Sequence, residues 1–163
     1  MNAPTLSPRT ESQADLRIAV GAETLLNLTL EAAQPLAIRF WVASTERPNP
    51  RMMLTLLTYC YASGIFGAED VERAAYADAT VRYICARESI RAADVRRFRR
   101  GNRPWIEHCL AQVIAQVWLR TNEHPEFRNA AGDARQELIL LEALRLARRR
   151  MVLAMQLDAA EAD

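Results

Sequence analysis

The stretch of sequence that decides the fold runs from Pro50 to Gly64 and reads PRMMLTLLTYCYASG. Its only charged side chain is Arg51, and apolar or uncharged residues occupy every side of a helical wheel. A helix that is apolar all round is buried by its neighbours. Pro50 and Gly64 stand where such a helix should begin and stop. The stretch therefore predicts a central, buried helix from Arg51 to about Ser63.

Downstream of this helix, apolar residues recur every three or four positions, which indicates a series of helices. Acidic residues suit the start of a helix from about Ala68 to Tyr76, and Asp78 is a good N-cap for the next one. A basic helix follows over residues 92–100. Asn102, with Pro104 after it, marks the start of another helix. The apolar stripe of that helix comprises Ile106, Leu110, Val113, Ile114 and Val117.

The last predicted helix begins at Asp133, where Gln136 completes a capping-box pattern, and it runs to about Leu157. Its stripe approximates a heptad seam, but the seam is short and contains alanine, so packing on its own domain is favoured over a coiled coil. The residues of this stripe are Leu140, Leu144, Ala147, Met151 and Ala154.

The segment that precedes the central helix is ambiguous. Leu26, Leu28 and Leu30 alternate as in a strand, whereas Leu25, Thr29 and Ala33 share one helical face. We assign this segment to a helix. The polar stretch Ser44–Pro50, which contains two prolines, then predicts a linker.

A length of 163 residues fits one domain with short appendages. We expect an all-α fold: a compact multi-helix domain with a helix-turn-helix-like segment and a long C-terminal helix. The expected organisation is a flexible leader at 1–15, a helical or uncertain segment at 16–48, a helical domain at 49–120 and the C-terminal helix at 133–158.

Composition excludes several classes of function. All 21 basic residues are arginines, which excludes lysine Schiff-base and P-loop chemistry. Cys60, Cys85 and Cys109 fall in apolar helical patterns and are expected to be buried thiols in a reducing cytoplasm. The two histidines lack zinc-motif spacing, so no metal and no cofactor are expected. The uncharged run from Met52 to Ala68 is short and polar for a membrane span, and no signal peptide is expected.

Positive charge gathers in one segment. Residues 82–103 hold eight arginines and two acidic residues, a net charge of +6 in a chain whose total is +1. On a helical wheel of residues 92–100, Val95 and Phe98 share one side. Arg96, Arg97 and Arg100 lie opposite them, with Arg99 at the side. A short helix that exposes arginine after two other short helices is how a helix-turn-helix enters a major groove. The candidate DNA-binding residues are Arg91, Arg96, Arg97, Arg99, Arg100 and Arg103.

Residues 49–115 also resemble a known family. The run PRMMLTLLTYCYASGIFGAEDVERAAYADATVRYICA, with VRRFRR at 95–100 and QVI at 112–114, is similar to the N-terminal domain of InsH-type insertion-sequence transposases. Two stretches depart from the family pattern: Gly67–Glu69 replace S-S-R, and Arg91–Asp94 replace D-H-x-T. The matching residues are Pro50, Arg51 and Met52; Tyr59, Tyr61, Gly64 and Ile65; Val71, Glu72, Arg73 and Ala74; Arg82 and Tyr83; and Val95, Arg97, Phe98 and Arg99.

The resemblance implies a helical DNA-binding scaffold from a bacterial mobile element. In that family, the domain is followed by an RNase H-like domain in which three acidic residues hold two metal ions. The residues after 115 lack strand signals and are dominated by one helix. We therefore expect no catalytic domain and no enzymatic activity in this chain.

Two functions of different classes compete. The first is a non-catalytic, transposase-like protein that binds double-stranded DNA in the cytoplasm. The second is a helical self-association or protein-interaction module without DNA binding, in which the same domain and the long C-terminal helix mediate self-association. A transposon fragment with no selected activity is a third alternative. His108 and Cys109 do not form a catalytic pair, because adjacent helical residues point about 100° apart. We expect Cys109 in the core, His108 at the surface or the boundary, and Tyr59, Tyr61 and Trp105 in the core or at its boundary.

Overall fold

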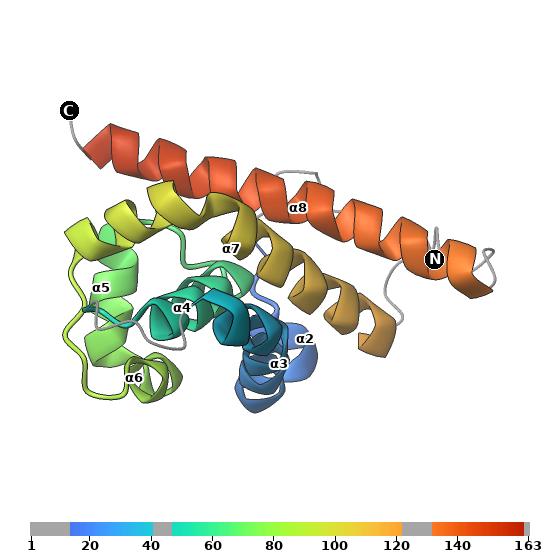
Figure 1. Ribbon diagram of the computed structural model, residues 1–163, viewed down its shortest axis with the longest axis horizontal. Coiled ribbons are helices and arrows are strands. Elements are labelled where there is room, and N and C mark those ends of the chain that lie inside the picture. The colour runs from blue at the N-terminus through green and yellow to red at the C-terminus, as the bar shows by residue number, and fades with distance from the viewer. Residues whose placement is uncertain (1–13, 41–46, 122–131, 162–163) are drawn as a thin grey trace, which may run out of the picture.

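The protein is described from a computed structural model, which places residues 14–40, 47–121 and 132–161. These residues form helices packed on one another, with no strand among them (Figure 1), and so the all-α prediction is confirmed. The leader expected at 1–15 lies outside the described residues except for its last two. The helices are α2 (Arg17–Val20), α3 (Ala22–Phe40), α4 (Pro50–Ala62), α5 (Ala68–Ala77), α6 (Ala79–Cys85), α7 (Ala92–Thr121) and α8 (Gly132–Glu161).

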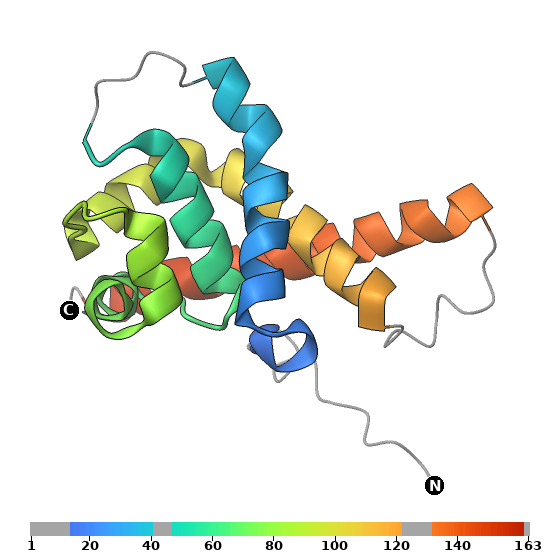
Figure 2. The same ribbon diagram turned by 90° about the horizontal axis from the view of Figure 1, so that it is seen from below.

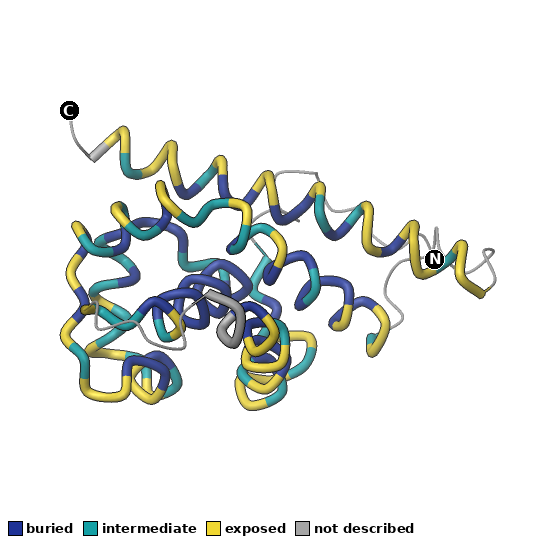
Figure 3. The backbone as a smooth tube through the Cα atoms, in the orientation of Figure 1, coloured by how far each residue is buried: buried dark blue, intermediate teal, exposed yellow. Residues whose placement is uncertain are grey.

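Helix α4 is the centre of the core, as its sequence predicts. Every residue from Met53 to Ala62 is buried, and Figure 3 shows this helix as a buried tube among its neighbours. The side chain of Asn49 caps the helix by accepting the backbone N–H groups of Arg51 and Met52. Because α4 contacts α3, α6 and α7, it fixes how these three helices are arranged.

The segment before α4 is helical, and the strand-like alternation has no structural counterpart. Leu25, Leu28, Thr29 and Leu36 are buried on one face of α3, at spacings that only a helix places together. Figure 2 shows α3 and α4 side by side on α7. The start of the stretch expected to be a linker lies outside the described residues. Its end is held in place, because the backbone N–H of Asn49 donates to Glu88 at 3.0 Å.

Helices α5, α6 and α7 follow one another closely. Asp78 caps α6 as predicted, accepting the N–H groups of Thr80 and Val81 at 2.9 and 3.0 Å. Ala86 and Arg87 then adopt positive φ angles of 47° and 71°, which end α6 and turn the chain toward α7. The result is a short helix, a turn and a longer helix. Val81, Ile84 and Cys85 are the residues that α6 buries, as its sequence predicts.

The break predicted at Asn102 appears as a kink within one long helix. Asn102 has φ −130° and ψ 19°, values outside the helical range, and its side chain donates to the carbonyl of Phe98 at 3.0 Å. Pro104, two residues later, removes a backbone donor at the same place. The two predicted helices are thus the two halves of α7. The apolar stripe predicted for the second half is buried in full.

Helix α8 lies along α7, and its buried face differs from the predicted stripe. Ala147, Met151 and Ala154 are buried as predicted, but Leu140 is exposed and Leu144 is half-buried. The contact face also includes Ile139 and Leu146, so it is rotated relative to the heptad seam. Helix α8 also begins one residue before the expected cap. Among the described helices, none is long and apolar enough to cross a membrane.

Candidate nucleic-acid interface

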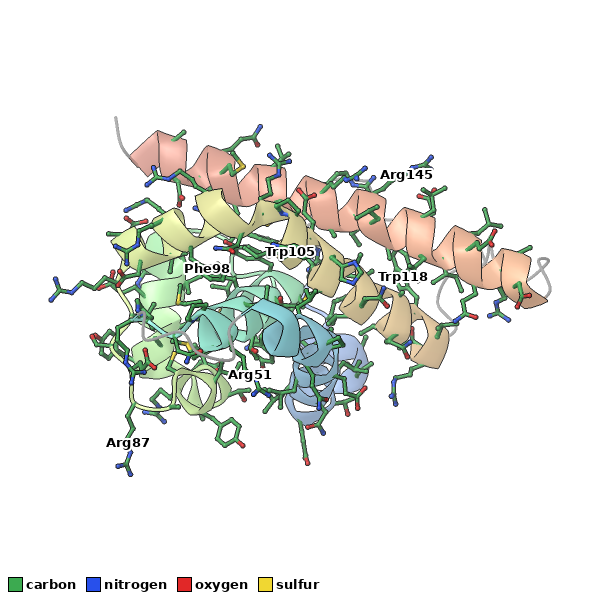
Figure 4. All side chains as sticks on the ribbon, in the orientation of Figure 1. Arg51, Arg87, Phe98, Trp105, Trp118 and Arg145 are labelled. Carbon is green, nitrogen blue, oxygen red and sulfur yellow. The ribbon has the colours of Figure 1, made fainter. Side chains whose placement is uncertain are left out.

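The first half of α7 has an outer face that carries exposed arginines. Arg97 and Arg100 are exposed there, with Ala93 and Gly101 also open to solvent, and Arg91, the residue before the helix, is exposed as well. Arg97 pairs with Asp94 at 2.8 Å, but its side chain is still 68% exposed. Within the described part of the chain, the side chain of Arg100 makes no hydrogen bond or ion pair. Arg87, in the preceding turn, points away from the body of the molecule (Figure 4).

The opposite face of the same half buries Arg99. Only 2% of this residue is exposed. Its Nη1 donates to the Tyr61 hydroxyl at 2.8 Å and to the Phe66 carbonyl at 3.3 Å, and its Nη2 forms an ion pair with Asp158 of α8. The sequence predicts Arg99 at the side of the helix and as a DNA ligand. Its burial removes it from any surface that a duplex could reach.

Arg96 and Arg103 occupy an intermediate position. Arg96 forms ion pairs with Glu69 of α5 and with Asp158, the latter at 3.8 Å. Arg103 pairs with Glu107 at 2.7 Å through Nε. Both side chains line the space between α7 and α8. The six candidate arginines are therefore divided between an outer face, a pocket wall and the core.

The burial of Arg99 follows from helical geometry. Ala92 and Val95 are buried on the face of α7 that packs against the core, and Arg99 is the next residue on that face. A guanidinium group is tolerated there because its Nη1 donates to two oxygens and its Nη2 meets a full negative charge. Burial raises the pKa of Tyr61 to about 12, although the neighbouring Arg99 acts in the opposite direction.

A second buried arginine, Arg150 of α8, has no counterpart in the sequence-based analysis. Its Nη1 donates to the carbonyls of Tyr61 and Ala62 at 2.6 and 3.1 Å, and its Nη2 donates to the carbonyl of Ala14 at 2.8 Å. These first two carbonyls belong to the C-terminal end of α4, where a helix carries partial negative charge. Arg99 and Arg150 thus hold α7 and α8 to the same end of α4.

The thiols and His108 lie as their sequence context predicts. All three cysteines are free and buried, and burial raises the pKa of Cys85 to about 11 and that of Cys109 to about 12. His108 is exposed, while Tyr59 and Tyr61 are buried and Trp105 is at the boundary. Residues 14–40, 47–121 and 132–161 contain no group of three His, Cys, Asp or Glu side chains that could hold a metal ion.

Comparison with known proteins yields no matching family model, no matching curated protein and no matching solved structure. Function is therefore inferred from the geometry of the chain itself. That geometry offers two features: an exposed arginine face on the first half of α7, and an arginine-lined space between this half and α8.

Proposed function

We propose that this protein binds double-stranded DNA, without cleaving it, through the outer face of residues 91–101. One observation carries the proposal: Arg97 and Arg100 are exposed on this face, Arg91 is exposed directly before the helix, and the exposed residues on the face, Ala93 and Gly101, are small. Small neighbours allow the helix backbone to approach a duplex closely. The arginine side chains can then reach phosphates or base edges.

The preceding elements support this role. Helix α6 and the turn at residues 86–91 lead into α7 in the order of a helix-turn-helix, in which the second helix enters the major groove. The same segment carries the net charge of +6 and the resemblance to the N-terminal domain of insertion-sequence transposases. The proposed face holds arginines and a single ion-paired carboxylate, Asp94, so its role is binding rather than chemistry.

The test is a titration of the full chain against random duplex DNA at several salt concentrations. Binding that neutralises three phosphates should give a slope of log K against log salt of about −2.7. Arg97→Ala should lower the affinity and make the slope less steep by about 0.9. If the affinity of the parent protein is independent of salt, or no binding is detected at low salt, the proposal fails.

Arg73 of α5 provides a matched control. Like Arg97, it is an exposed arginine paired with an aspartate three residues earlier, at 2.7 Å from Asp70 and with 73% of its side chain exposed. It lies on the side of α5 that faces Gly64 and Asp78, whereas Glu72 on another side contacts α7. Arg73→Ala changes the net charge equally and should leave both affinity and slope unchanged. An equal loss in both variants would indicate a general charge effect and contradict the proposed face.

Self-association through α8 is the second candidate, and it has its own observation. The side of α8 that points away from α7 carries apolar residues: Leu138, Leu141 and Val152 are each more than 40% exposed. Arg145 points outward on the same side (Figure 4). This function predicts a mass that rises with protein concentration and returns to that of a monomer in Leu141→Glu. A monomer at all concentrations excludes it.

A further inference from the structure

A pocket of about 740 Å³ lies where the start of α5, the first half of α7 and the end of α8 meet. Its charged lining comes from all three helices: Glu69 of α5, Asp158 of α8 and four arginines of α7. Its volume is within the range of sites that hold small organic ligands. The four arginines are Arg96, Arg99, Arg100 and Arg103.

The carboxylates around this pocket do not balance the arginines. Glu69 and Asp158 are paired with Arg96 and Arg99. Glu107 is shared between Arg103 at 2.7 Å and Arg148 at 3.7 Å. No carboxylate in the described residues pairs with Arg100. Among the residues that the structure describes, the cluster therefore has more arginines than carboxylates, five against three.

The unbalanced charge is accessible. Arg100 is exposed, and the side chain of Arg103 is 41% exposed. The Nη1 of Arg103 donates to the sulfur of Met155 at 3.5 Å, and a thioether is a weak acceptor that a charged oxygen easily displaces. Arg99 forms a fixed part of the wall, because its contacts with Tyr61 and Phe66 hold it in the core.

We propose that this pocket binds a dianionic phosphate group. A phosphate dianion suits the excess of arginine over carboxylate among the described residues of this cluster, and its oxygens accept the paired N–H groups that a guanidinium presents. Met155 and Ala159 add an apolar part to the lining, and the volume exceeds that of inorganic phosphate. The ligand class is therefore a phosphomonoester, either a free one such as a nucleoside monophosphate or the 5′-phosphate of a DNA strand.

This site can be tested separately from the proposed DNA face. Arg97 belongs to the outer face and is not part of the pocket lining, whereas Arg103 lines the pocket. Duplex binding through Arg97 can fail while the pocket binds phosphate, and the reverse also holds. Arg100 contributes to both surfaces and is therefore not used to separate them.

The first experiment measures thermal unfolding of the full chain with inorganic phosphate and then with a nucleoside monophosphate, against chloride at equal ionic strength. A ligand that binds only the folded state raises the melting temperature progressively with its concentration. Arg103→Gln should weaken binding about tenfold, because it removes charged hydrogen bonds. Arg97→Gln, the matched control on the same helix, should bind as the parent does. The proposal is overturned if neither phosphate compound exceeds chloride, or if Arg97→Gln weakens binding as much as Arg103→Gln.

A gain-of-binding variant sharpens the test. Glu69→Gln removes one negative charge from the pocket and leaves the buried pair of Arg99 and Asp158 intact, so the fold should survive. Its affinity for phosphate should rise at least about threefold, since a like charge beside the ligand has been removed. Unchanged or weaker binding in this folded variant would contradict an electrostatic phosphate site.

The two sources of phosphate are separated with blunt duplexes that carry either a 5′-phosphate or a 5′-hydroxyl. If the pocket serves DNA ends, the phosphorylated duplex binds more tightly, and Arg103→Gln abolishes the difference while Arg97→Ala does not. If it serves a free phosphomonoester, the nucleoside monophosphate binds and the two duplexes are equivalent. If no phosphorylated probe binds in a manner that depends on Arg103, the inference fails even where duplex binding through Arg97 holds.

Discussion

The two halves of α7 belong to one helix but are held in the fold by different interactions. Residues 102–121 pack through an apolar stripe in which Ile106, Leu110 and Val113 are fully buried. Residues 92–101 bury Val95 and then Arg99, which relies on Asp158 of α8 for its counter-charge. One half is stabilised by the hydrophobic effect, and the other depends largely on an ion pair with a distant part of the chain.

This difference determines what each half can do. An apolar stripe has one favourable position, which is inside the core. Arginine has several favourable positions. Its stem packs on apolar surface, while its guanidinium group pairs with a carboxylate, donates a hydrogen bond to a carbonyl or faces solvent. Neighbouring arginines in the first half of α7 occupy all three of these environments. It is therefore the half that can exchange an internal partner for an external anion.

The largest effect is expected for a charge placed in the second half. Leu110→Asp should prevent folding, because a buried carboxylate without a partner costs several kcal/mol against a total stability of about 5–15 kcal/mol. Circular dichroism during heating measures this. Ala93→Asp, on the exposed face of the first half, is the control and should melt as the parent does. A normal cooperative transition in Leu110→Asp would show that the second half is not part of the core.

The next largest effect is expected at the ion pair between Arg99 and Asp158. Asp158→Ala should lower the free energy of unfolding by about 3–5 kcal/mol, because it leaves the buried Arg99 without its counter-charge. It also removes the carboxylate that accepts the backbone N–H of Ala68 at 3.2 Å. Urea unfolding gives the value. The double variant Arg99→Met, Asp158→Leu should recover most of the loss, since apolar side chains replace a buried pair at little cost.

A double variant as unstable as Asp158→Ala would mean that the contacts of Arg99 with Tyr61 and Phe66, rather than the ion pair, hold this end of α7 in place. In that case the first half, like the second, would be stabilised without a buried ion pair, mainly by side-chain packing and neutral hydrogen bonds. The comparison between the halves would then be one of degree.

The buried thiols predict a smaller effect that depends on pH. Burial raises the pKa of Cys109, in the second half of α7, to about 12 from an ordinary value of 9.0, and that of Cys85 to about 11. The unfolded chain then loses these protons first as the pH rises. The stabilisation is complete below pH 9 and is lost as the pH rises toward 11 to 12.

We therefore expect the free energy of unfolding to fall between pH 9 and pH 11, and to fall less in Cys109→Ala than in the parent. The same burial predicts that a thiol reagent at pH 8 reacts only as fast as the protein unfolds. Rapid reaction of Cys109 in the folded protein would show that the second half of α7 opens to solvent.

Local signals in the sequence were sufficient for much of the fold. The central helix, the Asp78 cap, the break at Asn102 and the apolar stripe of the second half are all confirmed, because each depends on residues close together in the chain. The rotation of α8 could not be predicted, since leucines occur on several of its faces and only the partner helix selects one. For this reason Leu140 is exposed and Ile139 is buried.

The candidate site was harder to predict, because the environment of an arginine is set by other elements. Nothing near Arg99 in the sequence indicates Asp158, and nothing near Arg150 indicates the carbonyls at the end of α4. The exposure of Arg97 and Arg100 agrees with the helical wheel, which needed only Val95 and Phe98 to orient it. Arg96, which the same wheel places on the outer face, is instead half-buried and paired with Glu69 and Asp158. The role of the exposed arginines in DNA binding remains a prediction.

The smallest expected effect lies at Gly101, where the two halves meet. Glycine within a helix lowers stability by about 0.5–1 kcal/mol relative to alanine. A Cβ atom added at Gly101 would meet nothing within 4 Å, and positive φ values are confined to other residues in the described chain. Gly101→Ala should therefore raise the free energy of unfolding by about 0.5–1 kcal/mol in urea. Arg97→Ala, also on the exposed surface, should change it by less than about 0.5 kcal/mol. If Gly101→Ala is destabilising instead, the kink at Asn102 requires the backbone freedom of glycine, and the two halves of α7 are joined by a hinge rather than by a continuous helix.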